Sequence, residues 1–188
     1  MLRSSDVTTR FVLATLAFLV LYGALSAPLL WRSDTVALAL LAASIFLAGV
    51  LAALSAVDLS FYRLPDVLTL PLIAVGLFVS SWTGAAPLWW AVASAALGFF
   101  VLAGVAYVYQ YVRGRAGLGL GDAKLLAASG AWLGAGALPT VLLWATGSAL
   151  VCVLIASRRD DSLTGASRLP FGPFLSFGTW LVWLYGPL

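Results

Sequence analysis

Long apolar runs separated by short polar segments dominate the pattern of this 188-residue chain. The runs cover residues 11–31, 36–57, 64–81, 88–109, 122–136, 138–157 and 171–188. About 20 apolar residues let a helix cross a bilayer, and no run alternates apolar with polar residues as a membrane β-strand does. The pattern therefore predicts an all-α, polytopic membrane bundle of about seven transmembrane helices, forming a single domain over residues 1–188.

The first run has a second interpretation, because Arg10 followed by an apolar stretch that ends in small residues resembles a cleaved signal peptide. The run is long for such a segment, and Leu25 would occupy the −3 position of the cleavage site, where small residues are preferred. We therefore expect a retained helix over residues 11–31, peripheral to the core of the domain. Cleavage would leave the sidedness of the other helices unchanged.

Composition supports a membrane protein and excludes several kinds of chemistry. Hydrophobic residues make up 63% of the chain and charged residues 9%, whereas soluble domains are about 25% charged. The chain has no histidine and one cysteine, Cys152, which excludes a Ser-His-Asp triad, a Cys-His pair, a histidine-ligated metal and an internal disulfide. We expect no metal and no cofactor. The net charge of +3 is scattered between apolar runs, so we expect a lipid bilayer and no nucleic acid as partner.

The positions of the basic residues predict the topology. With the N-terminus in the cytoplasm, only Arg32 falls outside, and the other bases fall inside: Arg3, Arg10, Arg63, Arg113, Arg115, Lys124, Arg158, Arg159 and Arg168. Cytoplasmic loops of membrane proteins carry such an excess of Lys and Arg. This bias independently supports an odd number of crossings, with the C-terminus outside.

Three of the seven aspartates directly adjoin apolar runs. Asp6, Asp34, Asp160 and Asp161 lie in loops beside bases, whereas Asp58, Asp66 and Asp122 lie at the cytoplasmic ends of predicted helices. A charged residue at the centre of a membrane helix costs about 2.5–3.5 kcal/mol or more. These three acids either cap helices and neutralise neighbouring arginines, or they perform chemistry at one shared membrane level.

Two carboxyls at the same depth on different helices suit an aspartic hydrolase. Like charges a few ångströms apart do not both ionise readily, so one carboxyl keeps a proton while its partner stays anionic. The anion can take a proton from water, and the acid can polarise the scissile carbonyl and then protonate the leaving amine. This chemistry needs neither a metal nor a histidine.

The surroundings of Asp122 favour the chemical interpretation. Glycines alternate before it at positions 117, 119 and 121, which lets the backbone bend and lets an extended peptide approach closely. The helix that follows is rich in small residues, with Gly130 and Gly134 at a spacing that lets membrane helices pack closely.

Three blocks of sequence resemble the type IV prepilin peptidases and archaeal preflagellin peptidases, membrane aspartic proteases of the Gly-x-Gly-Asp class. The blocks are residues 58–71, with Asp58, a basic turn and Leu-Pro-Asp66; residues 119–134, with Gly-Leu-Gly-Asp122-Ala-Lys124 and a glycine-rich helix; and residues 170–174, Pro-Phe-Gly-Pro-Phe. With the hydropathy profile, the resemblance covers nearly everything after the first run.

The resemblance implies that Asp58 and Asp122 are the catalytic pair. It marks a further set for substrate binding or support of the site: Gly119, Gly121, Lys124, Asp66, Pro170 and Gly172. The family accepts Asp or Asn at the position of Asp66, so we expect a structural role there or a tuning effect on Asp58. Lys124 is either a cation at the membrane interface or a partner for an acidic group, on the substrate or on Asp66. Pro170 and Gly172 interrupt the backbone before the last helix.

The resemblance also implies a function: cleavage of short basic leaders from prepilin-like, pseudopilin-like or preflagellin-like precursors, just after a glycine, at the cytoplasmic face of the inner membrane. Such a multi-pass enzyme would serve a type IV pilus or protein secretion. Many bacterial members carry a cytoplasmic insert with paired cysteines, linked to N-methylation of the product. Here residues 31–36 form the first loop and the sequence has one cysteine, so we expect the short, peptidase-only form. Any methylation of the product would need a separate enzyme.

Other classes of function remain open from the sequence. A proton-coupled transporter would use buried carboxylates to carry protons, but these acids lie at one face, away from the midplane, and the chain shows no inverted repeat. A non-catalytic scaffold of a pilus or secretion assembly would keep the motif as structure. A Ser–Lys protease would need the chain's only lysine, which is on the cytoplasmic side beside a simpler acid pair.

Overall fold

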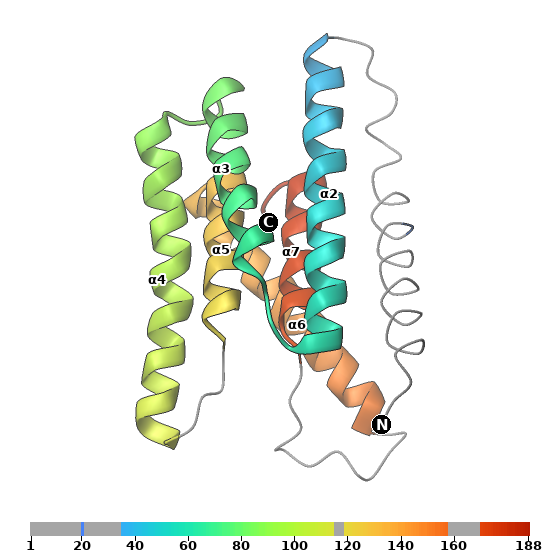
Figure 1. The fold of residues 1–188 in the computed structure, drawn as a ribbon, viewed down its shortest axis with the longest axis vertical. Coiled ribbons are helices and arrows are strands. Elements are labelled where there is room, and N and C mark those ends of the chain that lie inside the picture. Colours follow the sequence, from blue (N-terminus) through green and yellow to red (C-terminus); the bar gives the residue numbers. More distant parts are fainter. Residues whose placement is uncertain (1–19, 21–34, 115–118, 158–169) are drawn as a thin grey trace.

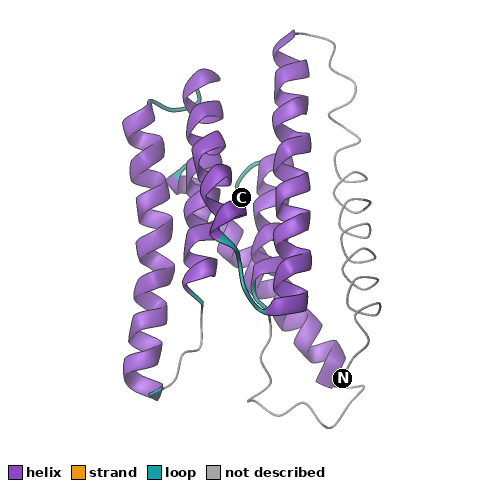
Figure 2. Ribbon diagram, viewed as in Figure 1, coloured by secondary structure: helices purple, strands orange, loops and turns teal. Residues whose placement is uncertain are grey.

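The computed structural model describes residue 20 and residues 35–114, 119–157 and 170–188, and every element in these ranges is helical (Figures 1 and 2). The elements are α2 (Thr35–Phe61), α3 (Asp66–Trp82), α4 (Leu88–Arg113), α5 (Leu120–Leu133), the short 3-10 helix η2 (Ala135–Ala137), α6 (Leu138–Ser157) and α7 (Gly172–Tyr185). The predicted all-α class is confirmed. The predicted first helix, residues 11–31, lies outside the described residues.

Each of the other predicted runs forms a helix, with some ends displaced. Helix α2 continues four residues past its predicted end at position 57, because no helix breaker precedes Tyr62, which adopts a left-handed φ of 54°. Asp58 therefore lies inside the helix, in its last turn. Helices α3 and α4 begin directly after Pro65 and Pro87, whose extended backbone ends the preceding loop.

Within the described residues, three segments are long and apolar enough to cross a membrane: Leu38–Phe61, Leu88–Arg113 and Ala135–Ile155. Asp66–Trp82 is a shorter apolar helix. The outward faces of α4 and α6 carry exposed apolar side chains, such as Phe100 and Val105 on α4 and Leu150 and Ile155 on α6. Such faces suit contact with lipid, so the helices support a membrane protein, while the number of crossings remains a prediction.

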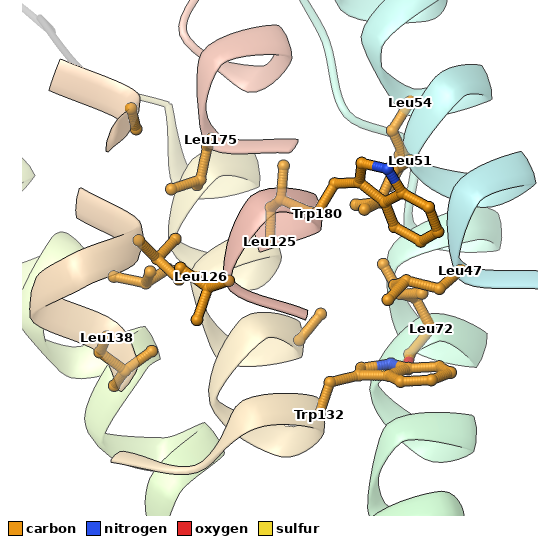
Figure 3. Close-up of a cluster of buried hydrophobic side chains, with 14 of the residues drawn as sticks. Leu47, Leu51, Leu54, Leu72, Leu125, Leu126, Trp132, Leu138, Leu175 and Trp180 are labelled. Atoms are coloured by element: carbon orange, nitrogen blue, oxygen red, sulfur yellow. The ribbon is translucent and has the colours of Figure 1, made fainter. Parts of the chain in front are cut away.

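Two short helices, α5 and α7, form the centre of the bundle. Helix α5 contacts α3, α4 and α7, and α7 contacts α2, α5 and α6, an arrangement visible in Figure 1. Along α5, every residue from Asp122 to Trp132 is buried except the half-buried Lys124. Figure 3 shows the core around them, built from large side chains of several helices: Leu47, Leu51, Leu54, Leu72, Leu125, Leu126, Trp132, Leu138, Leu175 and Trp180.

Small residues let α5 approach α4 closely. A Cβ on Gly130 would collide with the backbone carbonyl oxygen of Ser94, and a Cβ on Gly98 would lie 2.5 Å from the carbonyl oxygen of Leu126. Gly130 thus has the packing role that its spacing predicts. Gly134 does not: it ends α5 with a φ of 81°, and a Cβ there would meet nothing within 4 Å.

We expect Gly130→Ala to destabilise the protein by about 1–3 kcal/mol, because the added methyl group forces α4 and α5 apart. Thermal unfolding of the purified protein in detergent measures the change. Gly147→Ala is the matched control, since Gly147 also lies within a helix and its Cβ would meet nothing within 4 Å. The control should unfold at or above the wild-type temperature, because alanine favours helix over glycine. Equal unfolding temperatures for the two variants would contradict the close packing.

Candidate active site

Three acidic residues from distant parts of the sequence gather at one end of the bundle. Asp58 lies in the last turn of α2, Asp66 is the first residue of α3, and Asp122 lies in the first turn of α5. The lower ends of α2, α5 and α7 lie near one another in Figure 1, and the loop after α2 runs upward from there to the start of α3. Contacts link the three aspartates: Asp66 pairs with Lys124 of α5, and Asp58 interacts with Asp122. Their shared depth in a membrane stays a prediction.

Asp58 is held by the beginning of α7. Its carboxylate is buried, with 6% of the residue exposed, and its Oδ2 accepts a 2.9 Å hydrogen bond from the backbone N–H of Gly172. That N–H belongs to the first turn of α7, whose amide groups have no partner inside the helix and carry partial positive charge. Asp58 thus caps α7 from another helix, 114 residues away in sequence.

Gly172 is required by this close approach. A Cβ at this position would lie 2.7 Å from Oδ2 of Asp58, a separation that a real side chain does not adopt. Pro173 follows in the first helical turn, where its fixed φ favours the start of a helix. Pro170 precedes the turn and is half-buried. The interruption of the backbone that the sequence predicts at residues 170–173 therefore places a donor against Asp58.

Asp122 is also buried, with 8% of the residue exposed. Its backbone N–H bonds to the carbonyl oxygen of Gly119 at 3.1 Å, and its carboxylate accepts a backbone hydrogen bond from the same glycine. A Cβ on Gly121 would lie 2.8 Å from the Cβ of Leu64, so this glycine lets the α2–α3 loop pack against the start of α5. The two glycines thus shape the turn that presents Asp122.

The carboxylates of Asp58 and Asp122 are close enough to interact electrostatically. Both are more than nine-tenths buried, so water screens their mutual repulsion weakly. Such a pair holds its protons jointly, and the doubly ionised form is disfavoured. The arrangement can therefore offer one anionic and one protonated carboxyl within electrostatic range of each other, as acid–base catalysis on a water molecule requires.

Asp66 lies outside this buried pair. Its carboxylate forms an ion pair with Nζ of Lys124 at 2.5 Å, and the side chains are 57% and 30% exposed, respectively. Of the two alternatives for Lys124, the structure shows a partner for an acidic group, and that group is Asp66. Because both side chains reach solvent, the pair contributes under about 1 kcal/mol. It joins the starts of α3 and α5 beside the catalytic candidates.

Buried hydroxyl groups that the sequence pattern does not single out lie deeper along the same helices. Ser129 follows Asp122 by seven residues, or two turns, and its Oγ lies 2.7 Å from Oγ1 of Thr179 on α7. That spacing could have placed Ser129 on the face of Asp122, but nothing in the sequence identifies the partner helix. Among the described residues, no group of three or more His, Cys, Asp or Glu side chains could hold a metal ion.

Comparisons with known proteins identify the family of this chain. The model of the type IV leader peptidase family matches residues 45–156, which include Asp58, Asp66 and Asp122. The prepilin leader peptidase/N-methyltransferase of Aeromonas salmonicida (strain A449) is 41% identical over 146 residues, which cover 77% of this chain and 49% of that protein. The protein of the same name from Burkholderia pseudomallei (strain 1026b) is 44% identical over 132 residues, covering 70% of this chain and 42% of that protein.

A further relative of that name, from Pseudomonas putida, is 40% identical over 137 residues. The match covers 72% of this chain and 47% of the Pseudomonas protein. The chain thus spans about half the length of the curated relatives that it matches. No solved structure matches it significantly. Because the family model covers more than half of the sequence and includes all three aspartates at this end of the bundle, the chain belongs to the type IV leader peptidase family.

Proposed function

We propose that this chain is a membrane aspartic endopeptidase that cleaves the leader from prepilin-like or pseudopilin-like precursors, with Asp58 and Asp122 as its catalytic pair. The observation that carries the proposal is the buried, electrostatically interacting pair of carboxyls at one end of the bundle. Family membership supports the type of reaction. The names of the relatives support the class of substrate.

Hydrolysis follows from the pair acting together. The anionic carboxyl takes a proton from water while the water oxygen adds to the carbonyl carbon of the scissile peptide bond. The protonated carboxyl donates a hydrogen bond to the carbonyl oxygen, and a proton passes to the leaving nitrogen as the C–N bond breaks. One peptide bond and one water become a carboxylic acid and an amine. Because Oδ2 of Asp58 accepts the hydrogen bond from Gly172, we assign the contact with water to Oδ1 of that carboxyl.

The glycines beside Asp122 suit a bound peptide. Gly119 is exposed and precedes α5 with an extended backbone, at φ −80° and ψ 145°. A substrate in an extended conformation can lie against such a segment without obstruction by a Cβ. We assign Gly119 and Gly121 to the support of the peptide and of Asp122, and the pair of Lys124 and Asp66 to the fixing of the neighbouring helix ends.

We propose that the chain is a multi-pass protein of the cytoplasmic (inner) membrane, with about seven crossings and the aspartates at the cytoplasmic face. Arg63 follows the end of α2 and Arg113 ends α4, and the positive-inside rule favours the cytoplasm for both helix ends. Exposed tryptophans lie at the opposite ends of α3 and α4, where an outer interface would hold them: Trp82, Trp89 and Trp90. In this orientation, a leader–helix junction of the substrate meets the aspartates at the membrane boundary.

The relatives carry a double name, and our proposal covers leader cleavage alone. Cleavage just after a glycine, before the hydrophobic stem of the precursor, is the specificity that the family resemblance implies. Co-expression with a prepilin or pseudopilin of the same genome tests it. We expect the precursor to shift to the size of the mature protein on a gel, with a new N-terminus after the glycine. An unprocessed precursor with every such partner would contradict the proposal.

A further inference from the structure

One face of α7 lies against both helices that carry the aspartates. Gly172, Ser176, Thr179 and Trp183 follow one another at intervals of three or four residues, so they share a face of the helix. Gly172 bonds to Asp58 of α2, and Thr179 bonds to Ser129 of α5. We call the region where this face meets α2 and α5 the α7 seam.

Aromatic side chains pack together at the end of the α7 seam that is farthest from the aspartates. Nε1 of Trp183 donates a 2.8 Å hydrogen bond to Oγ of Ser44 on α2. The ring of Trp183 packs edge-on against Trp132 of α5, with the ring centroids 5.4 Å apart. Between these rings and the aspartates, the hydroxyls of Ser129 and Thr179 bond to each other and to the carbonyls of Leu125 and Leu175. The polar part of the seam therefore extends from the aspartates to these hydroxyls, two turns deep.

Ser176 lies between these two levels along α7, and its hydroxyl differs from those of its buried neighbours in the seam. It is fully buried, with 0% exposed, and within the described part of the chain its Oγ has no hydrogen-bond partner. The buried hydroxyls of Ser55, Ser129 and Thr179 each bond to the carbonyl four residues earlier. A buried hydroxyl without a partner costs about 1–3 kcal/mol, and buried water is the usual means of satisfying such a group.

We propose that Ser176 binds a water molecule in the α7 seam, one turn beneath the aspartates, and positions it toward them. Four residues of helix rise by about 6 Å, and two successive hydrogen bonds to one water span about 5.6 Å. A single water can therefore connect Oγ of Ser176 with the level at which Gly172 holds Asp58. Ser176 is a positioning residue for the hydrolytic water, and this part of the inference rests on the proposed function.

Kinetics test the positioning role. We expect Ser176→Ala to lower kcat for leader cleavage by about tenfold with KM within about twofold of wild type, because the variant still binds the peptide but holds water less well. Ser94→Ala is the matched control: it also removes a buried helical hydroxyl, one that bonds to the carbonyl of Trp90 on α4 and lies outside the seam. A kcat for Ser176→Ala equal to that of the control overturns the role in catalysis.

Hydration tests the site without relying on activity. A structure of the wild-type protein determined at a resolution that shows water should contain an ordered water within about 3 Å of Oγ of Ser176, and Ser176→Ala should lose it. A dry seam in the wild-type protein overturns the proposal, even if leaders are cleaved. If the water is present and no precursor is cleaved, the water site stands and the proposed function fails. If Ser176→Ala does not fold, the wild-type structure alone decides.

Discussion

Asp58→Asn and Asp122→Asn should each lower leader cleavage by about 10³-fold, within the range lost when a general acid or base is removed. Each change replaces a carboxyl with an amide of nearly the same shape. At position 58, the amide oxygen can still accept the hydrogen bond from Gly172, so α7 keeps its cap and the fold survives. What is lost is the ability of the pair to share and transfer a proton. Processing of a co-expressed precursor, normalised to the amount of folded enzyme, measures the effect.

Asp66→Asn is the matched control for these two variants. It makes the same chemical change at the same end of the bundle, but Asp66 is more than half exposed and pairs with Lys124. We expect this variant to retain activity within about threefold of wild type, since an exposed ion pair contributes under about 1 kcal/mol. Full processing by both Asp58→Asn and Asp122→Asn would refute the assignment of the catalytic pair and favour a scaffold that keeps the motif as structure.

Gly172→Ala should lower cleavage by about 10²-fold while the protein still folds. A Cβ at position 172 would lie 2.7 Å from Oδ2 of Asp58, so the carboxylate must move by several tenths of an ångström or more. Small displacements of a catalytic group can cost about 10²-fold in rate. The helix itself gains from the change, because alanine is the better helix former. Loss of activity without loss of stability distinguishes displacement of Asp58 from general damage.

Gly49→Ala provides the comparison for Gly172→Ala. Gly49 lies in α2, the helix that carries Asp58, and a Cβ there would meet nothing within 4 Å. This variant should cleave the precursor at the wild-type rate. Cleavage assays and thermal unfolding on both proteins separate the two effects. Equal cleavage rates for Gly172→Ala and Gly49→Ala would mean that the start of α7 does not hold Asp58 in the active enzyme.

Much of the fold could be predicted from the sequence, because the length and apolar character of a single segment are enough to predict a membrane helix. Six of the seven predicted helices lie in described residues, and each of them is observed. Errors occur at their ends, where local chemistry decides. Helix α2 passes its predicted end because only Tyr62 and Pro65 interrupt it, so Asp58 is a helical residue and not part of a loop.

Contacts between helices were much harder to predict. Hydropathy gives each aspartate a depth, but not its neighbours around the bundle, which depend on how side chains of several helices fit together. The bond from Gly172 to Asp58 and the pair of Lys124 with Asp66 join residues 114 and 58 positions apart. The family resemblance marked these residues as important without giving their contacts. The resemblance did not identify Ser176, because the position of this residue in the seam depends on the packing of α7 against α2 and α5.

The most direct test is the separation of the two carboxyls in an experimental structure with an uncleaved precursor peptide bound. We predict that oxygens of Asp58 and Asp122 lie on either side of one peptide bond, each within about 2.6–3.2 Å of the scissile carbonyl oxygen or of a shared water. Carboxyls that face different cavities, or that packed helices keep apart while the peptide is bound, would contradict hydrolysis by this pair.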